Sequence, residues 1–254
     1  MERLKIHFPA TAICVCLLGL VLYGCKDGAS SGSKLPTDGI FGDLPAIIND
    51  FGEQSIGLFE AVINTEDEKE MMELLGNKRE AIDSTTKAAL KVAFEKLGDK
   101  EFPTDVAAEV PLKVITPFKI VPEKSKDEGL FFSAEVENTG KIGVGKDMFR
   151  ISHIYVMFID KDGQPLCTLK DHSYIAEDAL KISEIGSRAH ITTKVKFTPW
   201  NAEWLSRAAK FLIVDYKSDF FKQANDTTKA AEWAYQKKTL ELATELMKKV
   251  SKKK

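Results

Sequence analysis

Three histidines beyond the N-terminal segment, His153, His172 and His190, are the side chains best suited to acid–base or metal chemistry. None has a second histidine, a cysteine or a carboxylate at the spacing that known metal-binding motifs use. Asp171 and Ser173 flank His172 and complete the residue types of a catalytic triad, but neighbours on a strand point to opposite faces of a sheet. We therefore predict structural roles for these residues, and no catalytic, metal or cofactor site.

Two glycine-containing stretches share part of a ligand-binding pattern. Residues 140–146 match the G-x-x-x-x-G-K spacing of a phosphate-binding loop. Asp147 replaces the Ser or Thr that would meet Mg²⁺, and the strand-like residues after it offer no helix N-terminus to a phosphate. Residues 160–163 begin like a calcium loop but lack its third ligand position and its distant glutamate. We interpret the first stretch as a hairpin loop and the second as a tight turn.

The four cysteines separate an N-terminal part from the body of the chain. Cys14 and Cys16 lie in an apolar N-terminal run, Cys25 ends that run, and only Cys167 belongs to the body. A single thiol cannot form an internal disulfide, so a fold outside the cytoplasm must rely on its hydrophobic core. Cys167 lies in a predicted strand with no activating group visible beside it, which favours a buried, unreactive thiol over a nucleophile.

Residues 1–24 have the architecture of an export signal: a short basic start, an apolar run and small residues near the end. The run is shorter than the roughly 20 apolar residues that a membrane-spanning helix needs, and an uncleaved membrane anchor is the alternative interpretation. The run leads into Leu22-Tyr23-Gly24-Cys25, which resembles the lipobox of bacterial lipoproteins. That motif has an aliphatic residue, two usually small residues and a cysteine, and Tyr23 departs from it.

This resemblance implies a lipid anchor. In bacterial lipoproteins the cysteine thiol receives a diacylglycerol, a dedicated peptidase cuts before the cysteine, and the new amine is often acylated. By this resemblance Cys25 is the site of lipid attachment, with palmitate among the expected acyl chains, and Leu22, Tyr23 and Gly24 are the signal peptidase recognition residues. It implies attachment to a membrane of the bacterial cell envelope, with the outer membrane favoured.

Residues 26–39 are mostly small and polar and are rich in glycine and serine, and we predict a flexible tether over 25–42 between the membrane and a folded domain. Cys25-Lys26-Asp27 also partly resembles the export signal of surface lipoproteins in the Bacteroidota. Gly28 stands where a second acidic residue would strengthen that signal. Periplasmic and surface orientations therefore both stay open.

The composition of the chain is that of a globular protein, with 44% hydrophobic and 29% charged residues. The formal net charge is -2 over 254 residues, so no global positive field attracts nucleic acid. We expect no nucleic-acid partner.

Residues 43–98 show helical periodicity and predict a helical hairpin with its joint near Asn64. Gly52 and Gly57 weaken the first helix and allow a break within it. Thr65 to Glu68 form a predicted capping box for the second helix, in which the Thr65 hydroxyl accepts from an early amide and Glu68 reaches back.

Residues 107–217 change to a period of two and contain six or seven β-rich runs separated by turn signals, which predicts an antiparallel β-sandwich. The order of features resembles that of immunoglobulin-like domains of secreted bacterial antigens and lipoproteins. The similarity lies in a run over 131–140 that ends in VENTG, a long central strand that enters the 160–163 turn, and Gly186 before a strand that ends at Phe197. It implies a non-enzymatic scaffold.

The run 151–159 is apolar on both faces, whereas a strand with one solvated face would alternate apolar and polar side chains. We therefore expect the N-terminal hairpin or a C-terminal helix to cover its second face. The predicted fold class is α+β, with the hairpin and the C-terminal helix packed on the sandwich and residues 43–254 forming one integrated unit.

Residues 225–254 predict a helix capped by Asn225 or Asp226 and ending in a lysine tail. Its apolar residues recur near heptad spacing at Trp233, Leu240 and Met247, with Ala243 and Val250 beside them. We expect this helix to dock on the sheet or the hairpin, with partner binding as the alternative. The lysines of 248–254 complement the negative end of the helix and form either a solvated tail or a contact with anionic lipid.

Trp200 and Trp204 lie four residues apart on a predicted helical turn. They fit a lid over one end of the sandwich or an aromatic platform for a sugar. The lid is favoured because paired tryptophans usually supply buried area.

These observations predict a membrane-anchored bacterial envelope lipoprotein whose domain binds an envelope protein or glycan without catalysis. One alternative is a hydrolase with a dispersed site, which requires His153 or His172 to meet a carboxylate and a nucleophile in a cleft. Another is a structural lipoprotein whose lysine tail bridges envelope layers, for which truncation after Leu246 would leave the fold intact.

Overall fold

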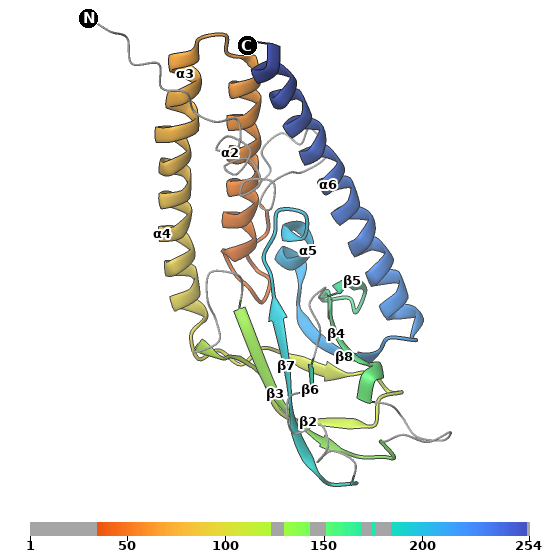
Figure 1. The fold of residues 1–254 in the computed structure, drawn as a ribbon. Coiled ribbons are helices and arrows are strands. Elements are labelled where there is room, and N and C mark those ends of the chain that lie inside the picture. The colour runs from red at the N-terminus through yellow and green to blue at the C-terminus, as the bar shows by residue number, and fades with distance from the viewer. Residues whose placement is uncertain (1–34, 123–129, 143–150, 169–173, 176–183, 253–254) are drawn as a thin grey trace, which may run out of the picture.

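The computed structural model describes residues 35–122, 130–142, 151–168, 174–175 and 184–252. Figure 1 shows β-sheets at one end of the molecule and long helices that rise from them; the longest are α2 (Leu44–Asn64), α4 (Arg79–Leu97) and α6 (Asp219–Lys252). This arrangement confirms the predicted α+β class. The expected export signal, the lipobox at 22–25 and the triad-like residues 171–173 lie outside the described residues.

The segment that precedes α2 is packed against the rest of the protein. Leu35, Ile40 and Phe41 are buried, and the Ile40 N–H donates to the Ala208 carbonyl at 2.9 Å. A Cβ atom added to Gly39 would stand 2.4 Å from the Ser206 carbonyl oxygen, so this approach requires glycine. The expected tether over 25–42 is therefore wrong for residues 35–42, because Ile40 and Phe41 supply apolar area to the core.

The helical hairpin is confirmed, with its joint at Asn64 as expected. After α2 the chain forms α3 (Glu68–Glu73), a π-helical turn η1 (Leu74–Lys78) and then α4. The break allowed at the glycines of α2 is absent, since α2 is continuous over 21 residues. A Cβ atom on Gly52 would lie 2.7 Å from Pro199 Cβ, so this glycine permits close packing of the helix against the Pro199 loop.

The cap of the second helical segment differs from the prediction. Asp67 is the N-cap residue, and its Oδ1 accepts a hydrogen bond from the Glu70 N–H at 2.9 Å. Thr65 Oγ1 instead donates to Glu70 Oε2 at 2.7 Å. A carboxylate two residues later thus takes the role expected of the Thr65 hydroxyl, because the helix starts two residues later.

Within the described residues, the strands form two four-stranded sheets. The first has the order β1-β8-β4-β5, from β1 (Thr104–Val106), β8 (Lys210–Asp215), β4 (Ile154–Ile159) and β5 (Pro165–Thr168). The second has the order β2-β3-β7-β6, from β2 (Leu112–Ile120), β3 (Leu130–Asn138), β7 (Arg188–Val195) and β6 (Tyr174–Ile175). All pairings between these strands are antiparallel except one: β1 runs parallel to β8. The short β1 precedes the region predicted to be β-rich, and it departs from the expected antiparallel sandwich.

The two sheets meet through phenylalanine rings. Phe211 on β8 lies 4.6 Å from Phe118 on β2 and 5.2 Å from Phe132 on β3, measured between ring centroids. Phe158 on β4 lies 4.7 Å from Phe211. All four rings are fully buried, so one aromatic cluster joins both sheets into a common core.

Helix α6 covers the outer face of the first sheet. Phe221 and Ala224 of α6 pack with four residues of β4 and β8, namely Met157, Ile159, Leu212 and Val214. This confirms that the second apolar face of the 151–159 run is covered, and it identifies the C-terminal helix as the covering element. The helix begins at Asp219, six residues before the predicted start.

The face of α6 that docks is not the one that the heptad-spaced residues occupy. Trp233, Leu240 and Met247 are 69%, 64% and 46% exposed. The buried face carries Phe221, Ala224, Tyr235 and Leu246, with two threonines among them. Thr228 Oγ1 donates to the Ala224 carbonyl at 2.7 Å, and Thr239 Oγ1 donates to the Tyr235 carbonyl at 3.0 Å. A threonine hydroxyl that bonds to the carbonyl four residues earlier can be buried at little cost. The docking face therefore could not be predicted from the apolar residues of the helix alone.

The C-terminal end of α6 is bound to the tip of the hairpin. Leu246 packs in a cluster with Leu58 and Val62 of α2. The Lys249 ammonium donates to the Ile63 and Thr65 carbonyls at the end of α2. Lys249 is thus a cap for another helix, and truncation after Leu246 would remove that cap, contrary to the fold-neutral truncation considered above.

The short helix α5 (Ala202–Arg207) fits the lid interpretation of the tryptophan pair. Trp204 is half-buried and packs against the main core. The helix itself contacts α2 and β5. Trp200 is half-buried at the turn that precedes α5.

Candidate functional site

The two described histidines belong to different sheet regions and have different surroundings. His153 precedes β4, is half-buried, and its ring packs edge-on against Tyr216 at 4.9 Å between centroids. His190 is exposed on β7 of the other sheet. His172, the other histidine that the dispersed hydrolase hypothesis names, lies outside the described residues. Among the described residues, no group of three or more His, Cys, Asp or Glu side chains is arranged to hold a metal ion.

The Cys167 thiol is buried in the core, as predicted. Cys167 on β5 is 2% exposed. Burial raises the pKa of the Cys167 thiol from 9.0 to about 12, against an opposing effect of the Arg207 charge. The neutral thiol is therefore the stable form at neutral pH, which does not suit a nucleophile.

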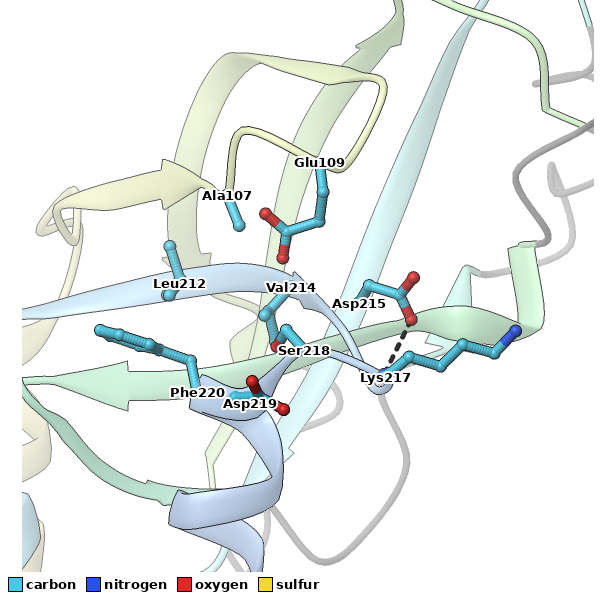
Figure 2. A pocket seen from close by; sticks show the side chains of 9 residues that line it. All are labelled: Ala107, Glu109, Leu212, Val214, Asp215, Lys217, Ser218, Asp219 and Phe220. Atoms are coloured by element: carbon cyan, nitrogen blue, oxygen red, sulfur yellow. Dashed lines mark hydrogen bonds between the residues drawn. The ribbon is translucent and has the colours of Figure 1, made fainter.

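A hollow of about 570 Å³ lies where β8 ends and α6 begins, and Figure 2 shows its lining. Three segments build it: the loop after β1, the end of β8 and the first turn of α6. The lining residues are Ala107, Glu109, Leu212, Val214, Asp215, Lys217, Ser218, Asp219 and Phe220.

Hydrogen bonds fix the turn that forms one side of the hollow. Asp215 Oδ1 accepts from the Lys217 N–H at 2.9 Å, and the Asp215 carbonyl accepts from the Ser218 N–H at 2.9 Å. Ser218 Oγ accepts from the Phe221 N–H at 3.2 Å, which is the geometry of a helix N-cap. The loop opposite is held to β8 by the Ala107 N–H, which donates to the Ile213 carbonyl at 2.9 Å.

The hollow combines an apolar floor with an acidic rim. Leu212, Val214 and Phe220 supply apolar surface, and Phe220 is 43% exposed. The rim carries the carboxylates of Glu109, Asp215 and Asp219 against the single cation of Lys217, which gives a net charge of -2 (one minus three).

The charged groups of the rim are placed differently. Figure 2 shows the Lys217 ammonium pointing away from the hollow, and the same group lies 5.9 Å from the centroid of the Tyr216 ring. Asp219 Oδ1 is paired with Lys222 Nζ at 3.0 Å, whereas Figure 2 shows the Glu109 carboxylate reaching from its loop over the hollow. The arrangement suits a ligand with a positive group beside an apolar one, since carboxylates only accept hydrogen bonds.

An aromatic cluster supports the hollow from β4. The Tyr155 ring lies 4.9 Å from Phe221 and 6.1 Å from Tyr216, between centroids. It thereby connects the sheet to both sides of the turn that starts α6. The hollow is thus built on packed elements that hold its rim in place.

Comparison with known proteins gives no relative to guide the function: no protein-family model, no curated protein and no solved structure matches the chain. Within the described ranges, no helix is both long enough and apolar enough to cross a membrane.

Sequence reasoning did not find the residues of the hollow. Asp215 and Asp219 are four residues apart, but Glu109 comes from a loop about a hundred residues earlier, and no motif connects it to them. One signal was present, because Ser218 stands three residues before Phe221 in the pattern of a helix start. This spacing predicts a helix that starts directly after Ser218, close to the end of the strand predicted before it.

Proposed function

We propose that this chain is a lipid-anchored protein of the bacterial cell envelope whose folded domain acts by binding. The observation that carries the proposal is the sequence Leu22-Tyr23-Gly24-Cys25 at the end of an export-signal-like segment. Two or three acyl chains on Cys25 hold a protein to a bilayer firmly, because each buried CH₂ contributes about 0.8 kcal/mol. Residues 26–34 then connect the anchor to Leu35, the first residue of the described domain.

We place the binding activity in the hollow between β8 and α6. Its apolar floor and net negative rim support a ligand of cationic, amphipathic chemistry, such as a basic segment of an envelope protein with an adjoining apolar side chain. The nine lining residues include no histidine or cysteine, and the Ser218 hydroxyl is used in the helix cap. This lining supports binding rather than turnover.

We also propose that the two sheets are a variant of the immunoglobulin-like sandwich. The support is two four-stranded sheets joined by one aromatic core. The parallel pairing of β1 with β8 is the point at which this protein departs from a purely antiparallel arrangement.

The anchor is tested by metabolic labelling with radioactive palmitate. We expect the wild-type chain to incorporate label and to sediment with membranes, and Cys25→Ser to incorporate none. Cys16→Ser is a matched control that should keep the label, because Cys16 lies inside the export signal. Equal labelling of wild type and Cys25→Ser, or unlabelled wild type that retains residues 1–24, would show that no lipid is attached at Cys25.

The hollow is tested with two small amphiphiles of opposite charge, octyltrimethylammonium and octyl sulfate, added below their micelle concentrations. We expect the cation to shift the backbone amide NMR signals of residues 217–220 and the anion to leave them unchanged. Glu109→Gln and Asp215→Asn should each weaken cation binding about fivefold, since a unit charge near 4 Å is worth about 1 kcal/mol in water.

The control for these variants is Glu60→Gln, which removes an exposed carboxylate of α2 outside the hollow. Its affinity for the cation should equal that of wild type. Equal binding of the two amphiphiles, or shifts confined to another surface, would exclude an acidic binding hollow.

A further inference from the structure

Helix α6 carries a narrow apolar seam on the side that faces away from the protein. The seam consists of Trp233, Leu240 and Met247, which are spaced by seven residues and are exposed by 69%, 64% and 46%. At about 100° per residue these three side chains fall within a sector of about 40° on the helix surface. The opposite side of α6 is already occupied by the sheet and the hairpin.

The width of the seam indicates what can cover it. A helix that lies in a membrane surface needs an apolar face of about 100° or more. On α6, Lys237 and Thr244 project within about 40° of Trp233, so polar side chains interrupt the 100° face that a membrane-surface helix would need. A narrow seam with a seven-residue period matches instead the contact that one helix makes with another.

We propose that the seam is the interface of a homodimer, in which α6 of a second copy packs antiparallel with a two-fold axis at Leu240. Leu240 then meets Leu240 of the second copy, and Trp233 meets Met247 at both ends. Each large ring faces a flexible side chain, whereas a parallel pair would set the two Trp233 rings against each other and the two Lys237 ammonium groups close together.

The charges along α6 favour the antiparallel direction. With the two-fold axis at Leu240, residues 226–236 of one copy lie opposite residues 244–254 of the other. Residues 226–236 contain two acidic residues and one lysine, a net charge of -1. Residues 244–254 contain five lysines and one glutamate, a net charge of +4. Antiparallel pairing sets these ends against each other and also opposes the two helix dipoles. The same surface patch serves both copies, as a two-fold interface requires.

The interface is short, with three large residues per copy, so we expect a reversible dimer with a Kd on the order of 1 to 100 µM. Sedimentation of the full chain, in detergent where it carries lipid, should show a monomer–dimer equilibrium in this range. Leu240→Glu should raise the Kd at least tenfold without changing the melting temperature of the monomer, measured at concentrations well below the wild-type Kd, because the side chain is exposed in the monomer. Val92→Glu alters another exposed apolar residue, on α4, and should leave the equilibrium unchanged.

Cysteine cross-linking gives the direction of the two helices. Oxidised Leu240→Cys should form a covalent dimer, and a mixture of Trp233→Cys with Met247→Cys should form a mixed dimer. Trp233→Cys alone should not cross-link beyond the parent chain, because in the antiparallel pair its two copies are 14 residues apart, about 21 Å along the axis. The thiol of Cys167 is buried and cannot compete, and the parent chain measures any cross-linking through Cys14, Cys16 and Cys25.

Two results would overturn this inference. A chain that stays monomeric up to 1 mM, with about the same background of cross-links at Leu240→Cys as at Val92→Cys, would show that no second copy covers the seam. Cross-linking of Trp233→Cys alone, without the mixed dimer, would show a parallel pair. Neither result bears on the lipid anchor or on the hollow, which have their own tests.

Discussion

Replacing Phe41 with alanine is expected to lower the free energy of unfolding by about 3–5 kcal/mol, the usual loss for a buried ring that leaves a cavity. Phe41 is 1% exposed, and its centroid lies within 6.1 Å of five other rings, those of Phe102, Phe132, Phe158, Phe197 and Phe211. These rings come from both sheets, from the segment before β1 and from the loop before α5. Phe41 therefore joins the segment before α2 to the core of the β-region.

Chemical denaturation followed by circular dichroism measures this loss. Phe220→Ala is the matched control, because it removes the same ring from an exposed position and should change the unfolding free energy by no more than about 0.5 kcal/mol. A Phe41→Ala protein as stable as Phe220→Ala would mean that residues 35–42 are not packed in the core.

The second large effect is a loss of stability at high pH caused by Cys167. Burial raises the pKa of this thiol to about 12 in the folded protein, against 9.0 ordinarily. Between these values the unfolded chain has released the thiol proton and the folded protein still holds it. The folded state then binds more protons, so stability falls as pH rises from about 9 and is unaffected by this group below that pH.

The expected slope is about 1.4 kcal/mol per pH unit, and the total approaches roughly 4 kcal/mol at pH 12. Urea unfolding of wild type and Cys167→Ala at pH 8, 9, 10 and 11 isolates the contribution, because lysines and tyrosines titrate in both proteins. The alanine variant should start less stable and lose stability more slowly with pH. Parallel stability curves for the two proteins would contradict a raised pKa at Cys167.

Local pattern was sufficient to predict several elements of this fold. Buried and half-buried residues alternate along β3, and apolar residues recur with a helical period on both sides of Asn64. Both patterns can be recognised in the sequence, because they follow from which face each residue buries. The two apolar faces of 151–159 also required a covering element, and α6 provides it. In each case a short stretch of chain carries the whole signal.

Other features depend on contacts between distant segments and could not be predicted. β1 has three residues and pairs in parallel with β8, about a hundred residues later. The hollow takes Glu109 and Asp219 from segments with no common spacing. The sequence also did not show which face of α6 docks on the protein. Thr228 and Thr239 lie on the docked face, because their hydroxyls bond to carbonyls of the same helix and can therefore be buried.

The bond from Lys249 to the end of α2 has a consequence for how the protein matures. The carbonyls of Ile63 and Thr65 are capped by a residue 186 and 184 positions later. While the chain is being made, the tip of the hairpin is therefore left without this partner until the last turn of α6 emerges. A nascent chain, or one clipped before Lys249, therefore leaves these two carbonyls without this cap.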